Sequence, residues 1–117
     1  MKILRLASAL ALAVCSLNAT AAGDPAAGQL KAGACVICHG ATGYPGIFYT
    51  LQLAGRNADK LTVKTNKYRS GKILHPIMNL SVLGLTDQDV ENISAYYQSL
   101  KQPILLWPGM AVQGDKD

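Results

Sequence analysis

Two cysteines and a histidine stand close together at Cys35, Cys38 and His39. The spacing Cys-x-x-Cys-His is the attachment signature of a c-type haem. Two thiols three positions apart on a tight turn can each add across one vinyl group of a porphyrin, which gives two thioether links. The imidazole that follows then reaches the iron as its proximal ligand. The sequence therefore predicts one covalently attached haem c with His39 bound to its iron.

Three other uses of this motif compete with haem attachment. A redox-active Cys-x-x-Cys is expected within a strand–helix–strand pattern, which this sequence does not show. A structural disulfide between Cys35 and Cys38 would leave His39 unexplained. A zinc site needs a second ligand pair at recognisable spacing, whereas the other histidine of the chain, His75, stands alone. Haem attachment is the preferred interpretation.

A distal iron ligand is expected in the segment 72–85, about forty residues after the motif. Pro76 and a later glycine favour a loop there, and Met78 is its one methionine. Methionine as a sixth ligand raises the reduction potential and keeps the iron six-coordinate. Met78 is the first candidate, His75 is the rival and Met110 is a remote one. A Met78 that merely fills a gap in the core is the structural alternative.

The first 21 residues have the features of a cleaved signal peptide. Lys2 and Arg5 form a basic region, an apolar run of about a dozen residues follows, and residues 19–21 form an A-x-A cleavage site. The run is short for a membrane span. We therefore expect export to a bacterial periplasm with Cys15 removed. Lipid attachment at Cys15 is less favoured because Val14 fits poorly before such a cysteine.

One small domain, residues 22–102, is expected after the signal peptide, followed by an apolar tail, residues 103–117. A domain of this size has a limited core, so a haem would supply much of its apolar interior. Cleavage lowers the formal charge from +4 to +2, and this weak balance argues against nucleic acid as a partner. The tail is too short to span a membrane. It either folds back on the domain or anchors a partner subunit.

Three helices are expected, over residues 26–34, 57–70 and 87–101. Their N-caps are Asp24, Asn57 and Thr86, and Gly71 ends the second helix. Val90, Ile93, Tyr97 and Leu100 form an apolar stripe on the last of them. Gly28 in the first is expected to allow close contact with another helix.

The second expected helix is strongly basic. Its basic residues and their neighbours are Arg56, Lys60, Lys64, Lys67, Arg69 and Lys72. Asp59 alone opposes them. Such a run is usually a solvated helix face. The alternative is a docking patch for an acidic redox partner, where attraction would increase the association rate.

The segment 40–55 is expected to be a loop, because glycine and proline dominate it and no clear periodicity is present. Its residues 47–49 form an apolar patch that either packs on a haem or belongs to the ordinary core. Pro45 is expected to help place a backbone carbonyl near the ring N–H of His39 and so fix the tautomer.

Together these pieces resemble the small bacterial class I cytochromes c. The nearest likeness is to single-haem domains of dihaem periplasmic cytochromes and to the haem subunit of flavocytochrome c sulfide dehydrogenases. The matching pieces, within residues 23–101, are Gly28 seven residues before Cys35, the haem motif with Gly40, Leu53-Ala54-Gly55, Tyr68-Arg69-Ser70-Gly71, Ile77-Met78, and residues 85–87 leading into residues 93–97.

The resemblance implies an all-α fold of three to four short helices around a covalently bound haem, with Gly28 and Tyr96 meeting where the first and last helices cross. It implies His39 as proximal ligand and a loop methionine as distal ligand. Two departures stand out. Many relatives have a second methionine, often the ligand, where this chain has Ser81, and a proline where it has Leu51.

The function implied by this resemblance is that of a periplasmic monohaem electron carrier, not an enzyme, which meets redox partner proteins in transient contacts. The alternative is the haem subunit of a stable oxidoreductase complex with a flavoprotein, such as a flavocytochrome c sulfide dehydrogenase. A third alternative is a catalytic or gas-binding haem with an open distal side. It is less favoured, because His75 is the one candidate acid–base group for it in the sequence.

Overall fold

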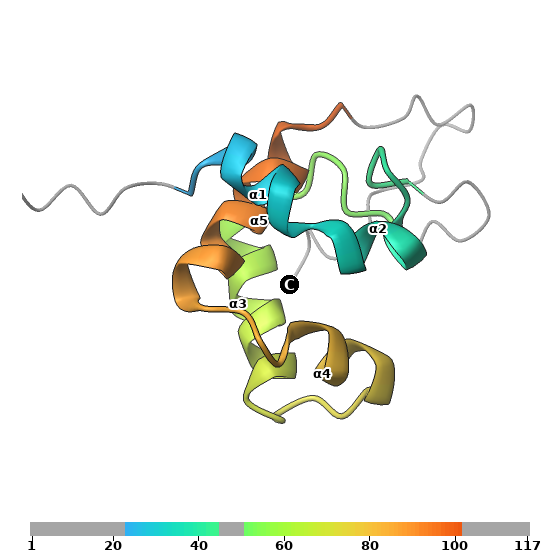
Figure 1. Ribbon diagram of the computed structural model, residues 1–117, viewed down its shortest axis with the longest axis vertical. Helices are drawn as coiled ribbons and strands as arrows, with labels where there is room; N and C mark the ends of the chain where they lie inside the picture. Colours follow the sequence, from blue (N-terminus) through green and yellow to red (C-terminus); the bar gives the residue numbers. More distant parts are fainter. Residues whose placement is uncertain (1–22, 45–50, 102–117) are drawn as a thin grey trace, which may run out of the picture.

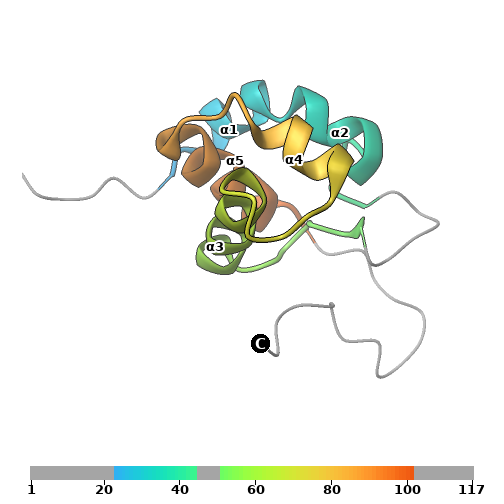
Figure 2. The same cartoon turned by 90° about the horizontal axis from the view of Figure 1, so that it is seen from below.

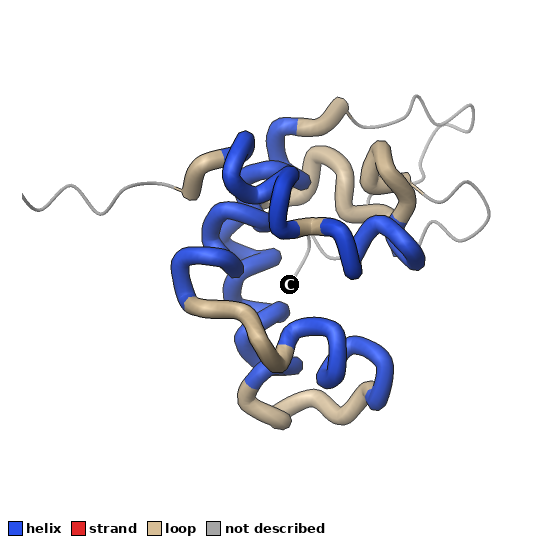
Figure 3. Tube along the Cα trace, in the orientation of Figure 1, coloured by secondary structure: helices blue, strands red, loops and turns tan. Residues whose placement is uncertain are grey.

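The computed structural model describes residues 23–44 and 51–101 of the chain. These residues form five α-helices: α1 (Pro25–Lys31), α2 (Gly33–His39), α3 (Ala58–Arg69), α4 (Pro76–Val82) and α5 (Asp87–Ser99) (Figure 1). In this described part, helices are joined by loops and turns without a β-strand (Figure 3). The predicted all-α class is confirmed.

Five helices exceed the three to four expected, for two local reasons. The expected helix over residues 26–34 is divided at Ala32, which ends α1 and precedes α2. The segment 72–85, expected to be a loop, contains α4. Pro76 occupies the first turn of α4, where its fixed φ suits a helix and its missing N–H is not needed. The proline that suggested a loop therefore begins a helix.

The predicted ends of the helices are confirmed where side chains cap them. Asp24, Asn57 and Thr86 each accept a hydrogen bond from a backbone N–H in the first turn that follows. Thr86 and Asp89 form a reciprocal capping box, with N···O distances of 3.1 and 3.0 Å. Gly71, with φ of 75°, follows α3 in the left-handed region, as expected of a helix stop.

Helices α1 and α5 cross in close contact (Figure 1). A Cβ atom built on Gly28 would lie 2.0 Å from the carbonyl oxygen of Asn92, so the backbones meet where glycine has no side chain. The expected close contact is confirmed. Its nearest atoms belong to Asn92 and Ile93, however, and not to Tyr96, which lies one turn further along α5.

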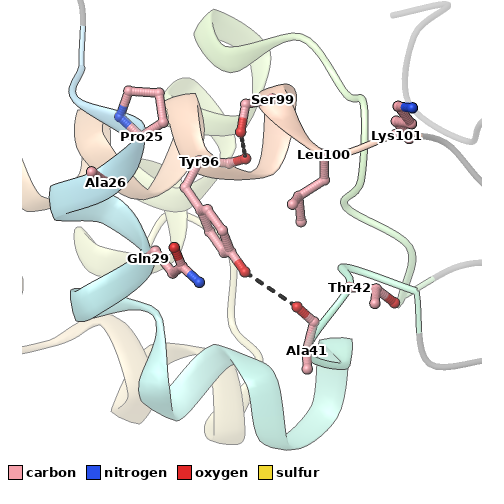
Figure 4. A pocket seen from close by; sticks show the side chains of 9 residues that line it. All are labelled: Pro25, Ala26, Gln29, Ala41, Thr42, Tyr96, Ser99, Leu100 and Lys101. Atoms are coloured by element: carbon pink, nitrogen blue, oxygen red, sulfur yellow. Dashed lines mark hydrogen bonds between the residues drawn. The ribbon is translucent and has the colours of Figure 1, made fainter.

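Tyr96 instead connects α5 to the turn that follows α2. Its hydroxyl donates to the carbonyl oxygen of Ala41 at 3.2 Å (Figure 4). The same view shows an open surface groove of about 570 Å³, bounded by α1, this turn and the end of α5. Lys101, the last described residue, lies at the edge of this groove.

The core lies on the stripe predicted for α5. Val90, Ile93 and Tyr97 are buried and Leu100 is half-buried. Ala32, fully buried between α1 and α2, packs into the same cluster. Helix α3 runs against α5 on another side (Figure 2). α5 therefore supports α1 and α3, while α2 packs on α1 and α4 packs on α3.

Several sequence predictions fall outside the described residues. These are the signal peptide 1–21, Pro45 and the apolar patch 47–49, Met110, and the tail 103–117. Within the part that is described, no helix has both the length and the apolar character that crossing a membrane requires.

Candidate functional site

A cavity of about 340 Å³ opens between the helices, a volume in the range of cofactor pockets. Residues from α2, α3, α4 and α5 line it, together with the loop 51–56. All four predicted site residues, Cys35, Cys38, His39 and Met78, are among them. Leu61, Thr65 and Tyr68, placed by their spacing on one face of α3, line it as well. The structure therefore brings together residues about forty positions apart.

His39 is held at the end of α2 with its proton position fixed. The residue is buried, and its Nδ1 lies 2.5 Å from the carbonyl oxygen of Leu51. Because a carbonyl oxygen only accepts hydrogen bonds, Nδ1 must carry the proton, which leaves Nε2 with its lone pair. His39 can therefore offer Nε2 to a metal, in the arrangement that orients metal-ligating histidines.

The backbone carbonyl expected beside the His39 ring is that of Leu51. Pro45 itself lies outside the described residues. Gly43 holds the chain around Leu51 in place, because its carbonyl accepts from Leu53 N at 2.8 Å and from Ala54 N at 3.1 Å. Gly55 N donates to the Tyr97 carbonyl at 2.8 Å, so the same loop is fixed to α5.

Cys35 and Cys38 are free thiols on α2, a short helix where a tight turn was expected. Residues three positions apart are neighbours on a helix surface, so both thiols border the same cavity. Burial raises the pKa of the Cys35 thiol, and a backbone hydrogen bond partly offsets this. Redox-active Cys-x-x-Cys motifs have a cysteine of lowered pKa. Cys35 therefore lacks the character of an activated redox thiol.

Met78 and its rival His75 both border the cavity, from α4 and from its N-cap. The His75 ring is used by the helix, because its Nδ1 accepts from the backbone N–H of Met78 at 3.3 Å. A neutral imidazole that accepts at Nδ1 carries its proton on Nε2. In this arrangement neither ring nitrogen of His75 has a lone pair free to bind a metal. The sulfur of Met78 keeps its lone pairs.

The cavity lining is mainly apolar with two basic side chains. Arg56 is buried and Lys64 is exposed, and both border the cavity. Aspartate and glutamate are missing among the described residues that line it. Nor are any three histidine, cysteine, aspartate or glutamate side chains, among residues 23–44 and 51–101, placed to hold a metal ion together. The lining suits a large apolar ligand that carries negative groups.

Comparison with known proteins decides the family. The chain is 38% identical over 81 residues to cytochrome c-554(548) of Halomonas halodenitrificans, an alignment that covers 67% of this chain and 98% of that protein. It is 37% identical over 98 residues to cytochrome c4 of Pseudomonas aeruginosa, covering 83% of this chain and 49% of that protein. The chain belongs to the class I cytochromes c.

The chain spans about half the length of the cytochromes c4 that it matches, which include that of Stutzerimonas stutzeri at 32% identity over 108 residues. No protein-family model matches it. The family recognised from the sequence is confirmed, and the helices of the part that the structure describes form the class I cytochrome c fold.

Sequence reasoning missed two groups whose hydrogen bonds near the site of this cytochrome involve the backbone. The Leu51 carbonyl is one, and its signal is only that relatives have a proline at this position. Asn79 is another, because its amide binds three backbone groups around the start of α4. One signal for Asn79 was present. It is the single amide side chain within the apolar stretch that surrounds Met78.

Proposed function

We propose that this cytochrome carries single electrons between redox partner proteins in the periplasm, through one covalently bound haem c. The observation that carries the proposal is the convergence of both free thiols, His39 and Met78 on one apolar cavity. A cofactor that changes oxidation state by one electron, with both axial ligands retained, suits such transfer.

The residues present fit a haem. Cys35 and Cys38 would hold it through thioether links, and His39 Nε2 and the Met78 thioether would bind its iron. Arg56 and Lys64 would complement its carboxylates. When bound, haem supplies an iron that changes between ferric and ferrous states. The chain contributes ligands, exclusion of water and a docking surface.

One haem is supported for these 117 residues by their single Cys-x-x-Cys-His motif. Export is supported by the basic residues Lys2 and Arg5, the apolar run and the A-x-A site before residue 22. Covalent attachment keeps the cofactor from being lost in an extracytoplasmic compartment. We therefore place the mature domain, residues 22–102, in the periplasm.

The haem assignment is tested by a pyridine haemochrome assay and mass spectrometry on protein exported from a host that matures c-type cytochromes. We expect one haem per chain, a mass increased by one covalent haem, and an amino terminus at residue 22. A Cys38→Ala variant should lose one of the two thioether links. A secreted chain with the mass of its amino acids alone, without Soret absorption, would contradict the proposal.

The distal ligand is tested by Met78→Ala and His75→Ala, a matched pair from α4 and its cap. The ferric protein should show the absorbance band at the red end of the visible spectrum that methionine–iron(III) ligation gives. We expect Met78→Ala to abolish this band and to lower the reduction potential, since methionine ligation raises it. His75→Ala should keep the band. A band that survives Met78→Ala would point to another methionine, Met110, and an unmodified protein without the band would leave His75 as the candidate.

A second candidate function is favoured by the apolar surface of α4. Leu74, Ile77, Leu80 and Leu83 are all exposed along this helix and its ends. Large apolar patches on a protein surface mark interaction sites, which suits a haem subunit held permanently in an oxidoreductase complex with a flavoprotein. Size-exclusion chromatography of a periplasmic extract separates the two candidates. A haem peak that elutes with flavin supports the complex, and a haem peak at the size of a monomer supports the carrier.

A further inference from the structure

The Asn79 side chain holds the connection between α3 and α4, beside a backbone hydrogen bond from Ile73 N to the Lys67 carbonyl at 3.1 Å. Its Nδ2 donates to the carbonyl oxygens of Tyr68 at 2.6 Å and Ile73 at 2.9 Å. Its Oδ1 accepts from the backbone N–H of His75 at 2.6 Å. Three backbone groups spread over residues 68–75 are thus held by a single amide, which we call the Asn79 clasp.

The clasp joins the two helices that flank the cavity from this side. Tyr68 lies in the last turn of α3, and His75 is the N-cap of α4. Asn79 also donates its own backbone N–H to the His75 carbonyl at 2.8 Å. Met78 immediately precedes Asn79 in the same helical turn. The position of Met78 relative to α3 therefore depends on these hydrogen bonds.

Packing within the protein fixes α4 only in part. Val82 is 2% exposed, whereas Leu80 is 76% exposed and is not among the residues that line the cavity. An element with few buried apolar contacts opens locally at low free energy. Hydrogen bonds must then help to hold α4 in place where packing does not. The three bonds of Asn79 are short and run between different parts of the chain.

We propose that Asn79 is a positioning residue for Met78. By holding the start of α4 against the end of α3, the clasp keeps the thioether at the cavity and slows its replacement by ligands from solution. The inference rests on the proposed function, in which Met78 is the distal ligand. Groups that orient a metal ligand change metal-site properties by about 10- to 100-fold when they are removed.

The test measures how fast imidazole binds to the ferric protein, at imidazole concentrations where loss of the native ligand limits the rate. Asn79→Ala removes all three bonds of the clasp. Asn79→Asp keeps the acceptor for His75 N but replaces the donor to Tyr68 O and Ile73 O. We expect the limiting rate to rise at least about 10-fold in both variants. The reduction potential and the intensity of the red-end band should fall.

Thr86→Ala is the matched control, because it also removes a side-chain hydrogen bond to the backbone but lies at the start of α5. It should lower the stability of the fold while leaving the imidazole rate and the potential unchanged. If Thr86→Ala accelerates imidazole binding as much as Asn79→Ala does, general loosening explains the effect and the proposal is wrong.

The unmodified protein provides a measurement that needs no variant. Replacing Met78 by imidazole should open the clasp, so hydrogen exchange at the His75 amide should accelerate in the imidazole-bound form. An unchanged exchange rate would overturn the proposal. A ferric protein that lacks the red-end band contradicts Met78 ligation itself. A protein that has the band but binds imidazole at the same rate in both Asn79 variants contradicts only the clasp.

Discussion

Two adjacent tyrosines on α5 differ in whether their hydroxyl groups are satisfied. Tyr96 donates to the carbonyl oxygen of Ala41. The hydroxyl of Tyr97 is buried and has no hydrogen-bond partner in the described structure. Burial, with smaller contributions from Cys35 and Tyr96, raises the pKa of Tyr97 far above its ordinary value, so it stays neutral. A buried polar group without a partner opposes folding, because it has lost its water.

We therefore predict opposite effects for Tyr96→Phe and Tyr97→Phe. Loss of the Tyr96 hydroxyl should lower the free energy of unfolding by about 1 kcal/mol, the net value of a typical hydrogen bond. Loss of the Tyr97 hydroxyl should leave that free energy unchanged or raise it by about 1 kcal/mol. Urea unfolding of the haem-loaded proteins measures both. Tyr97→Phe destabilised as strongly as Tyr96→Phe would mean that the Tyr97 hydroxyl has a partner in the loaded protein.

Single residues also show what the sequence can predict about the site. Cys35, Cys38 and His39 could be selected as candidates because their chemistry resides in side chains at fixed local spacing, and the structure places all three at one cavity. The acceptor for His39 is a backbone carbonyl at Leu51, and every residue has such a carbonyl. Only the folded path of the chain selects it. The clasp at Asn79 was hidden for the same reason, since its partners are backbone groups.

At the scale of helices, the crossing of α1 and α5 depends on one missing side chain. A Cβ on Gly28 would meet the Asn92 carbonyl at 2.0 Å, whereas a Cβ on Gly33, at the start of α2, would meet nothing within 4 Å. Both are glycines in short helices. Gly28 lies in the middle of α1 against α5, and Gly33 begins α2 with open space beside it, so the pair compares a close contact with a free position.

Gly28→Ala should therefore separate α1 from α5 and lower the free energy of unfolding by about 3 kcal/mol, as overpacking of a close contact does. Gly33→Ala should be neutral or stabilise the fold by up to about 1 kcal/mol, because alanine favours helix over glycine. Thermal unfolding followed by circular dichroism measures both. Equal effects of the two substitutions would show that helix propensity, and not the crossing, determines the result.

Helix ends were well predicted and helix continuity was not, again for a physical reason. Asp24, Asn57 and Thr86 cap through their own side chains, which is a local property. The break at Ala32 has one weak local signal, Gly33, which follows it and is a poor helix former. Ala32 is fully buried in the core beside α5, so tertiary packing contributes to the change of direction there.

The capping box of α5 predicts an effect of acid. The backbone N–H of Thr86 is the main cause that lowers the pKa of Asp89, followed by the Thr86 hydroxyl and, less strongly, Lys31. A carboxyl with a lowered pKa in the folded state stabilises the fold above its unfolded pKa, and this contribution is lost as pH falls through the folded value. Stability should therefore decrease below about pH 4.

Asp89→Asn should remove this part of the acid sensitivity. The variant should be less stable than the unmodified protein at pH 7, and the difference should shrink as the pH is lowered toward 2. Asp59→Asn is a suitable control, because Asp59 is an exposed acid in the first turn of α3. Urea unfolding at several pH values measures the difference. If the difference in unfolding free energy between Asp89→Asn and the unmodified protein stays constant from pH 7 to pH 2, titration of Asp89 is not the cause.

At the scale of the molecule, positive charge gathers on one side of the cavity. Lys60, Lys64 and Lys67 are exposed and lie three or four positions apart along α3, so they share a face. Lys64 also borders the cavity. Lys101 lies elsewhere, at the groove between α1 and the end of α5. The basic run was predicted as either a solvated face or a docking patch, and its place beside the cavity favours attraction of an acidic partner.

Small redox ions can distinguish a docking patch from a solvated face without knowledge of the partner. The reduced protein should react faster with the anion ferricyanide as salt is lowered, because positive charge beside the electron-transfer site attracts it and salt screens the attraction. Lys64→Glu should slow this reaction roughly five-fold at low salt. Lys101→Glu makes the same change of net charge away from the cavity and should have a much smaller effect. If both substitutions slow the reaction equally, net charge alone is responsible, and the basic face of α3 is only a solvated surface.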